Sequence, residues 1–167
     1  MSSLPILIFP DPRLKKVATI IHNIDAKIQR TIDDMFETMY AAKGIGLAAT
    51  QVNIHHRIVV VDCSCGKNNP LCLINPNIIQ YEGNIIHEEG CLSFPGFYAK
   101  ISRYKIITIE YLDEKNNLKT LNTDKLMSIC LQHEIEHLDG ITLYNHLSPL
   151  KQKLIKNKLK RLSDYSV

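Results

Sequence analysis

The sequence predicts an α+β fold, because segments with the apolar spacing of helices stand on both sides of a block of short strands. The helical segments cover residues 25–43, 124–139 and 148–163, whereas β-branched runs and turn residues dominate between 57 and 121. A chain of 167 residues is long enough for one domain with its own hydrophobic core. We therefore expect residues 1–167 to form a single domain.

The composition is typical of a soluble globular protein. Hydrophobic residues make up 45% of the chain and charged residues 22%, and no apolar run is long enough to cross a bilayer. The first residues lack the basic and apolar segments of a signal peptide, so we expect no membrane association and a cytoplasmic location. The five cysteines lack a regular spacing, which indicates thiols or metal ligands and not a set of disulfides.

The first predicted helix covers residues 25–43. Asn23 or Asp25 can cap its start, and Gly44 follows its end. Its apolar residues recur on one face, so packing against the core is a sufficient role for it. They are Ile28, Ile32, Met35, Phe36, Met39 and Tyr40.

Residues 44–52 are predicted to form a loop of small and apolar residues. Their Gly-x-Gly-x-x-Ala pattern is not a dinucleotide-binding motif, since that motif follows a strand and a helix precedes it here. Glycine leaves the backbone open to an extended ligand, and Gln51 is then a polar side chain directed into a site. A tight apolar turn is the alternative.

Several short strands are predicted in the middle of the chain. The β-branched run at 57–62 is typical of a buried strand, and the proline in Asn75-Pro76 indicates an edge or a bulge. A turn at 113–117 predicts a hairpin. The other expected strands are 71–74, 77–81, 84–88, 105–112 and 118–121.

Residues 89–93 place a cysteine in an irregular segment. Gly90 precedes Cys91, and Pro95-Gly96 follow shortly afterwards. Cys91 has no apolar run of its own to pack in. This context favours a reactive thiol or a metal ligand over an inert buried thiol.

The segment 131–140 contains His-Glu-x-x-His. On a helix, His133 and His137 lie one turn apart on one face and can bind one metal ion, while Glu134 can reach a water molecule beside it. This arrangement is typical of metal-assisted hydrolysis, and a surface helix with alternating acid and histidine is the alternative. An apolar wall is expected beside the metal, because the face of His133 also contains Leu126, Ile129 and Cys130.

Basic residues concentrate near the C-terminus. The net charge is +3, and residues 151–167 contain six basic side chains and one acidic one. The segment 148–163 is predicted to be an amphipathic helix that packs on the body and leaves a basic face in water; contact with nucleic acid is the alternative. Its apolar residues are Leu150, Leu154, Ile155, Leu159 and Leu162.

Three segments together resemble the motifs of the peptide deformylase family: Gly-Ile-Gly-Leu-Ala-Ala-Thr-Gln at 44–51, Glu-Gly-Cys-Leu-Ser at 89–93 and Gln-His-Glu-Ile-Glu-His-Leu at 132–138. The final helix resembles that of the bacterial type with a helical C-terminus. The resemblance implies small antiparallel sheets packed around a central metal-binding helix, with an N-terminal and a C-terminal helix. Glu136 departs from the family, in which aspartate is more common, and its longer side chain leaves its partner open.

The resemblance implies that Cys91, His133 and His137 bind one divalent metal ion per chain. One thiolate and two neutral imidazoles leave a fourth tetrahedral position for water. Fe²⁺ is the expected native ion, and Zn²⁺, Ni²⁺ or Co²⁺ can occupy the site in prepared samples, because these ligands suit several metals.

The resemblance also implies roles for other residues. Glu134 matches the general base and acid, while Gln51 and the backbone N–H of Leu92 match the donors that stabilise the oxyanion. Glu89 and Arg103 are expected to pair and to fix the Cys91 loop. The peptide backbone is expected to bind at Ile45, Gly46 and Gly90, and the methionine side chain at Leu126, Ile129 and Cys130.

The implied reaction is hydrolysis of the N-formyl group from the N-formylmethionine of newly made polypeptides, with release of formate. We expect a monomer, and the basic helix at 148–163 indicates contact with the ribosome, where this substrate emerges.

Two alternatives stay open at this point. An HExxH peptidase would use a third ligand downstream of the motif, and His146 is the candidate. A structural metal site with four closed ligands would need Cys130 as the fourth ligand.

Overall fold

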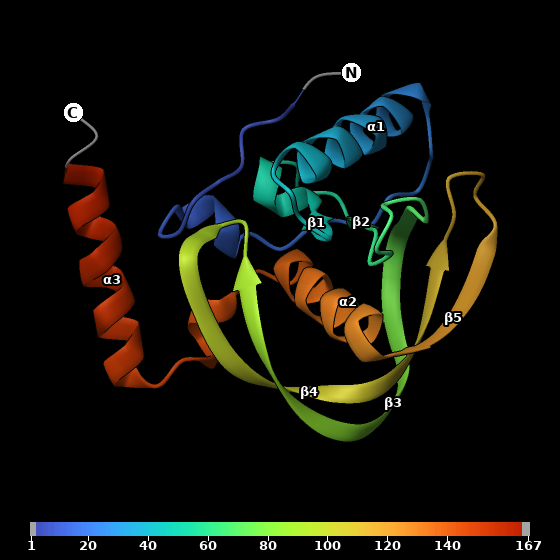
Figure 1. Cartoon of the computed structure of the whole chain (residues 1–167). Helices are drawn as coiled ribbons and strands as arrows, with labels where there is room; N and C mark the ends of the chain where they lie inside the picture. Colours follow the sequence, from blue (N-terminus) through green and yellow to red (C-terminus); the bar gives the residue numbers. More distant parts are fainter. Residues whose placement is uncertain (1–2, 165–167) are drawn as a thin grey trace.

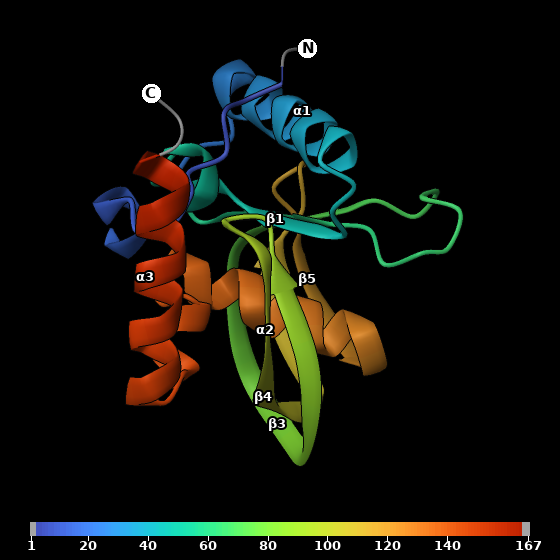
Figure 2. The ribbon, with the colours of Figure 1, turned by 60° about the vertical axis from the view of Figure 1, so that its left-hand side comes forward.

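The computed structural model describes residues 3–164 and confirms the predicted α+β class (Figure 1). Three α-helices accompany one antiparallel sheet: α1 (Ala26–Ala41), α2 (Lys125–Leu138) and α3 (Pro149–Asp164). The sheet curves around α2, α1 lies across one end of the molecule and α3 lies at its side (Figures 1 and 2). Within residues 3–164, no helix is long and apolar enough to cross a membrane.

The sheet contains five strands in chain order, each antiparallel to the next: β1 (Gly46–Ala48), β2 (Ile58–Val61), β3 (Leu71–Cys91), β4 (Phe94–Leu112) and β5 (Leu118–Asp124). The prediction of separate strands between 71 and 88 was wrong, because these residues form one strand. The pairing register shifts between Ile74 and Asn77, and Asn75 has a positive φ of 50°. Such an irregularity bends a strand without ending it.

The predicted loop at 44–52 contains strand β1 and a 3₁₀ turn, η2 (Ala49–Val52). Among the described residues, β1 pairs with β2 on one side and leaves its other edge unpaired. A Cβ on Gly46 would lie 2.6 Å from Cys130 Sγ and 2.8 Å from Glu134 Oε1. Glycine is therefore required for β1 to lie this close to α2.

Two apolar clusters pack α2 and α1 against the sheet. One includes Leu131 and Leu138 and lies between α2 and the sheet, and the other includes Met35 and Met39 and joins α1 to β1 and β2. Asp25 caps α1, as predicted, by accepting hydrogen bonds from two backbone N–H groups of the first turn. The histidine motif of α2 is thereby held in the centre of the molecule.

α3 packs on the body through fewer residues than its sequence pattern indicated. Ile155 and Leu159 are buried, but Leu150 and Leu154 are 70% and 58% exposed. The prediction that this apolar face packs on the body is therefore confirmed for Ile155 and Leu159 and was wrong for Leu150 and Leu154. The side chain of Leu162 lies outside the described residues.

Candidate metal centre

The candidate metal centre lies where α2 meets the turn between β3 and β4. Cys91 is the last residue of β3 and pairs with Phe94 across a two-residue turn, while α2 supplies His133 and His137. The two histidine Nε2 atoms are 3.2 Å apart, and Cys91 Sγ lies 3.3 Å from His137 Nε2. All three atoms lie within 4.8 Å of one another. The structure thus brings the three predicted ligands together.

These three groups fit a divalent metal ion. Thiolate and imidazole ligands bind zinc-like ions at about 2.0–2.3 Å, so neighbouring ligand atoms of a tetrahedral site lie about 3.4–3.6 Å apart. The observed separations are close to this value. Burial lowers the pKa of His137 well below its usual value, so its imidazole is neutral, as a metal ligand must be.

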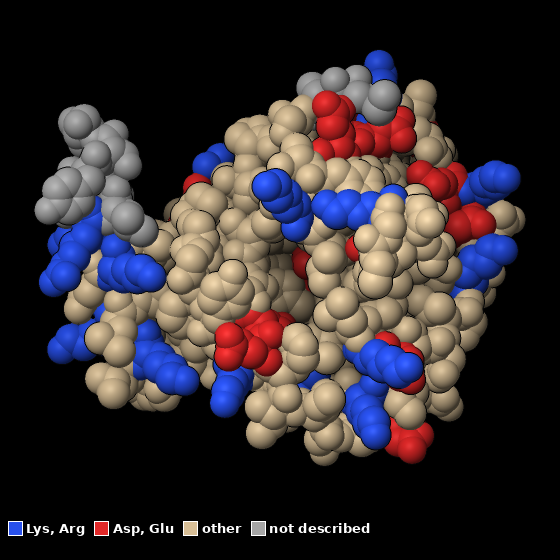
Figure 3. Space-filling model, in the orientation of Figure 1, with Lys and Arg blue, Asp and Glu red and all other residues tan. Residues whose placement is uncertain are grey.

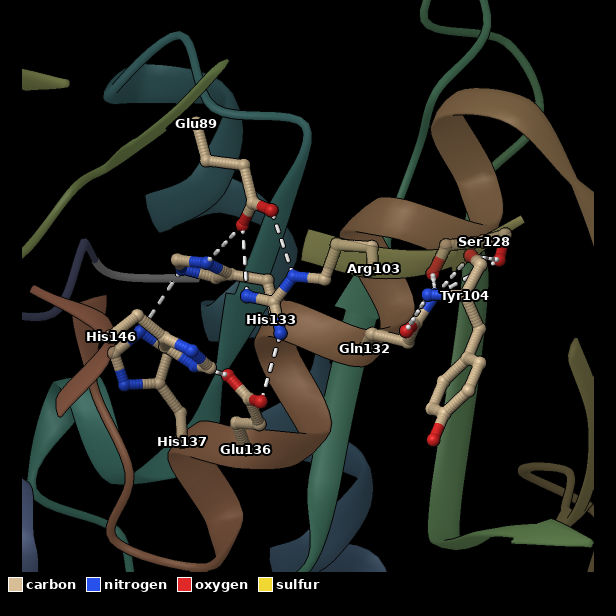
Figure 4. A network of polar contacts seen from close by, with 9 residues as sticks. All are labelled: Glu89, Arg103, Tyr104, Ser128, Gln132, His133, Glu136, His137 and His146. Atoms are coloured by element: carbon tan, nitrogen blue, oxygen red, sulfur yellow. Dashed lines mark hydrogen bonds and ion pairs between the residues drawn. The ribbon is translucent and has the colours of Figure 1, made fainter. Parts of the chain in front are cut away.

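A buried ion pair orients the ring of His133 (Figure 4). Arg103 donates from Nε to Glu89 Oε2 at 2.7 Å and from Nη2 to Glu89 Oε1 at 2.9 Å, which confirms the predicted pair. Burial favours a raised pKa for Glu89, but hydrogen bonds from His133 and Arg103 lower this pKa to about 2. The Glu89 carboxylate accepts the hydrogen of His133 Nδ1 at 3.1 Å, so the other ring nitrogen, Nε2, faces the cluster.

Glu136 pairs with Arg103 from another side. Arg103 Nη1 lies 2.8 Å from Glu136 Oε1, and His146 Nε2 lies 2.8 Å from Glu136 Oε2. The longer side chain of Glu136 therefore has two partners. His146 does not belong to the cluster of Cys91 and the two motif histidines, which contradicts the alternative in which it is the third ligand.

Gln51 is buried beside Cys91. Its Oε1 accepts a hydrogen bond from the Ala48 backbone N–H at 2.9 Å, so its Nε2 is directed at Cys91 Sγ, at 3.5 Å, and at the Ser93 hydroxyl, at 3.2 Å. The polar side chain predicted to point into a site therefore lies at the cluster. The sequence did not predict Ser93, and its only signal was its place two residues after Cys91.

Glu134 adds a carboxyl group to the centre. Its side chain is buried, and within the described part of the chain its Oε2 has no hydrogen-bond partner. Burial raises the pKa of this carboxyl to about 7. Glu134 can therefore hold or release a proton near neutral pH.

A cavity of about 510 Å³ opens in front of the cluster. Cys130 lies in its wall, with Sγ 3.9 Å from the carbonyl oxygen of Ile45 and outside the ligand cluster, which contradicts the closed four-ligand alternative. Gln51 and His137 are not part of the wall and contact Cys91 instead. The predicted site residues that line the cavity are Ile45, Gly46, Gly90, Cys91, Leu92, Leu126, Ile129, Cys130, His133 and Glu134.

The sequence did not predict the aromatic part of the cavity wall. Phe94, Phe97 and Tyr98 line the cavity. The Tyr98 ring lies against the backbone of Gly90, where a Cβ would be 2.8 Å from the ring. These positions depend on how the β3–β4 hairpin folds back, and closeness to Cys91 in the sequence was their only signal.

A Cys-His-His cluster with two buried histidines, a buried carboxyl group beside it and a cavity in front of it defines a metal-dependent hydrolase. The model of the family described as Polypeptide deformylase matches residues 3–153. The chain belongs to the polypeptide deformylase family, whose activity is that of a metallohydrolase.

Relatives of the same length and solved structures agree with this assignment. The chain is 47% identical over 166 residues to the peptide deformylase of Pseudoalteromonas translucida, with 99% of each chain covered. It is 46% identical over 167 residues to that of Neisseria meningitidis serogroup C, with 100% of each covered. The peptide deformylase structure from Legionella pneumophila matches with a TM-score of 0.93 and 37% identity, over 99% of this chain and 100% of that chain. The structure from Ehrlichia chaffeensis in complex with actinonin has a TM-score of 0.93 and 38% identity, over 96% and 98% of the two chains.

Proposed function

We propose that this chain removes the N-formyl group from the N-formylmethionine of newly made polypeptides and releases formate. Membership of the deformylase family supports the reaction. The observation that supports this site as its location is the buried Glu134 carboxyl, which lines the same cavity as the candidate ligands Cys91 and His133.

Cys91, His133 and His137 would hold one divalent metal ion. When bound there, the ion supplies Lewis-acid polarisation of the formyl carbonyl. We propose Fe²⁺ as the native ion, with Zn²⁺, Ni²⁺ or Co²⁺ as substitutes, because a thiolate and two imidazoles suit all of them. Metal analysis of protein purified without oxygen tests the choice, and a preparation that contains another metal in full would contradict Fe²⁺.

Glu134 moves the proton in the proposed reaction. Its carboxylate takes a proton from the attacking water and then gives it to the departing amine nitrogen, so that formate and a free amino terminus result. The raised pKa of about 7 supports both steps, because the group is then easily converted between its two forms.

Gln51 and Leu92 hold the oxyanion that develops on the formyl oxygen. The Gln51 Nε2 donor is fixed because its Oε1 is bonded to the Ala48 backbone, and a fixed donor needs no reorganisation during the reaction. The backbone N–H of Leu92 is the second donor, from the turn that follows Cys91.

The substrate binds as an extended chain beside β1. The unpaired edge of β1 at Gly46 offers backbone groups to the substrate, and Ile45 and Gly90 line the same cavity. The methionine side chain fits against Leu126, Ile129 and Cys130, the apolar wall supplied by α2.

We also propose that residues 1–167 form one catalytic domain that acts as a monomer in the cytoplasm. One buried cluster contains Leu7 and Phe9 from the N-terminal segment together with Ile155 and Leu159 from α3, which supports a single unit. Basic side chains gather on α3 (Figure 3), which supports contact with ribosomal RNA at the exit of new chains.

The double variant Lys151→Glu, Lys153→Glu tests the ribosome contact. It leaves the buried residues of α3 in place, so it should fold normally and co-sediment less with ribosomes than the wild type. Unchanged co-sedimentation would exclude this contact.

Formate release from N-formyl-Met-Ala-Ser tests the proposed reaction. Metal-loaded protein should release formate from this peptide and should not cleave the unformylated peptide Met-Ala-Ser. Cleavage of the unformylated peptide, without formate release, would show a peptidase instead.

A further inference from the structure

A chain of polar contacts connects the surface residue His146 to the candidate ligand His133 (Figure 4). His146 Nε2 lies 2.8 Å from Glu136 Oε2, and the other oxygen of Glu136 lies 2.8 Å from Arg103 Nη1. Arg103 holds Glu89 with two hydrogen bonds, and Glu89 accepts the hydrogen of His133 Nδ1. Each side chain in this chain of contacts therefore restrains the next one.

Arg103 is the central member of the chain of contacts. Its side chain is 3% exposed, and its three nitrogen atoms are all engaged, two by Glu89 and one by Glu136. A buried guanidinium that loses a carboxylate partner is left with an unpaired donor, which is costly. The position of Glu136 thus affects how firmly Arg103 holds Glu89.

Glu136 needs a second partner to stay in place. It lies in the last turn of α2, where the helix carbonyl groups disfavour a negative charge, and its side chain is 26% exposed. A carboxylate only accepts hydrogen bonds, so the contact assigns a hydrogen to His146 Nε2. This donor holds Oε2 and keeps Glu136 from turning into water.

His146 is held rigidly enough to act as an anchor. Gly140 turns the chain back with φ +74°, and a Cβ at Gly140 would lie 2.4 Å from the Lys15 carbonyl oxygen. His146 then ends the 3₁₀ turn η3 (Leu143–His146), in which Leu143 is buried and Asn145 Oδ1 accepts from the Thr142 backbone N–H at 2.9 Å.

We propose that His146 is a positioning residue of the metal centre. By anchoring Glu136, it keeps Arg103 on Glu89 and so fixes the ring of His133 as a metal ligand. The inference rests on the proposed function for the role of His133. His146 lies at the end of the contact chain that is distant from the metal centre, and its side chain is 28% exposed.

The test compares His146→Phe, which removes the donor, with His146→Gln, which keeps an N–H donor. The measurement is the rate at which a chelator removes Co²⁺ from the loaded protein, together with the visible absorption bands of bound Co²⁺. Loss of a group that supports a ligand directly, as Glu89 supports His133, typically weakens metal binding about 10–100-fold. His146 lies three contacts further away, so we expect a smaller effect, about 3–10-fold faster release for His146→Phe. His146→Gln should stay within about twofold of the wild type, as should the control His22→Phe at an exposed histidine.

A double-mutant cycle tests whether His146 acts through Glu136. Adding His146→Phe to Glu136→Ala should not accelerate metal release further, because the side chain that transmits the effect is already absent. Equal release rates for the wild type and His146→Phe, with unchanged Co²⁺ bands, would overturn the proposal. It would also be overturned if His146→Gln released metal as fast as His146→Phe, since the effect would then come from packing. These readouts do not need turnover, so a chain that binds Co²⁺ but releases no formate would contradict the proposed function alone.

Discussion

Gln51 and Glu134 approach the metal centre with one polar atom each. Gln51 uses its Oε1 on the Ala48 backbone and directs its Nε2 at Cys91, whereas Glu134 is buried with an Oε2 that has no partner among the described residues. Neither residue is part of the three-ligand cluster. Their roles can therefore be separated from metal binding by single substitutions.

Gln51→Leu should lower kcat about 100- to 1,000-fold, because removal of one oxyanion donor has effects of this size. KM should change little and metal content should stay at one ion per chain, since Gln51 is not a ligand. Steady-state kinetics and metal analysis check this. The control is Gln80→Leu at an exposed glutamine of β3; a kcat for Gln51→Leu as high as that of the control would remove Gln51 from the reaction.

Cys91→Ala should abolish stable metal binding, because two imidazoles remain where three ligands converged. Metal analysis after gel filtration measures the loss. Cys65→Ala, at an exposed cysteine, should retain the full complement. Full metal retention in Cys91→Ala would show that the ligand set is different.

At the residue scale, the sequence predicted what depends on local geometry. His133 and His137 lie on one face because helical spacing fixes them. The partner of Glu136 was not predictable, because His146 reaches it only through the turn at Gly140 and the short η3 segment. No pattern in the sequence encodes that return of the chain.

At the scale of elements, the approach of β1 to α2 sets the distance between the unpaired edge of β1 and the Glu134 carboxyl. The unpaired edge of β1 lies beside Glu134, since Gly46 has no side chain to separate them. A strand with any other residue at this position would lie further away. The glycine is therefore part of the geometry of the site.

Gly46→Ala should lower the free energy of unfolding by about 1–3 kcal/mol, the usual cost of forcing a methyl group into a packed interior. Deformylation should fall as well, because the added carbon would meet Glu134 and Cys130. Urea unfolding and formate release measure the two effects. Gly66→Ala is the control, since its Cβ would meet only the Asn68 side chain, at 3.3 Å; equal stability of the two variants would contradict the close approach.

The strand boundaries show why elements were only partly predictable. Asn75-Pro76 was recognised as an interruption, but the sequence does not show whether an interruption ends a strand or bends it. Pairing with β4 decides, because the register resumes at Asn77 after the shift. The residues at 44–52 were assigned to a loop, although three of them pair with β2.

At the scale of the whole molecule, α3 is a basic helix attached by a narrow contact. Its buried residues, Ile155 and Leu159, join a cluster with Phe9 and Leu14 from the N-terminal segment. The alternation of apolar and basic residues was visible in the sequence. The sequence did not show which of the apolar residues are buried, because the body covers only part of that face of α3.

Ile155→Ala should destabilise the protein by about 2–4 kcal/mol, since it empties a fully buried position. Leu154→Ala, the neighbouring residue at 58% exposure, should change stability by less than about 0.5 kcal/mol. Thermal and urea unfolding of both variants measure the difference. Equal effects would mean that α3 does not dock in the way described.

The most direct test of the central claim is formate release and metal content measured on one sample of Glu134→Gln. This substitution keeps the shape of the side chain and removes its ability to exchange a proton. We predict one metal ion per chain and a kcat reduced about 10²–10⁴-fold relative to the wild type. A variant that holds its metal and still releases formate at the wild-type rate would contradict the account.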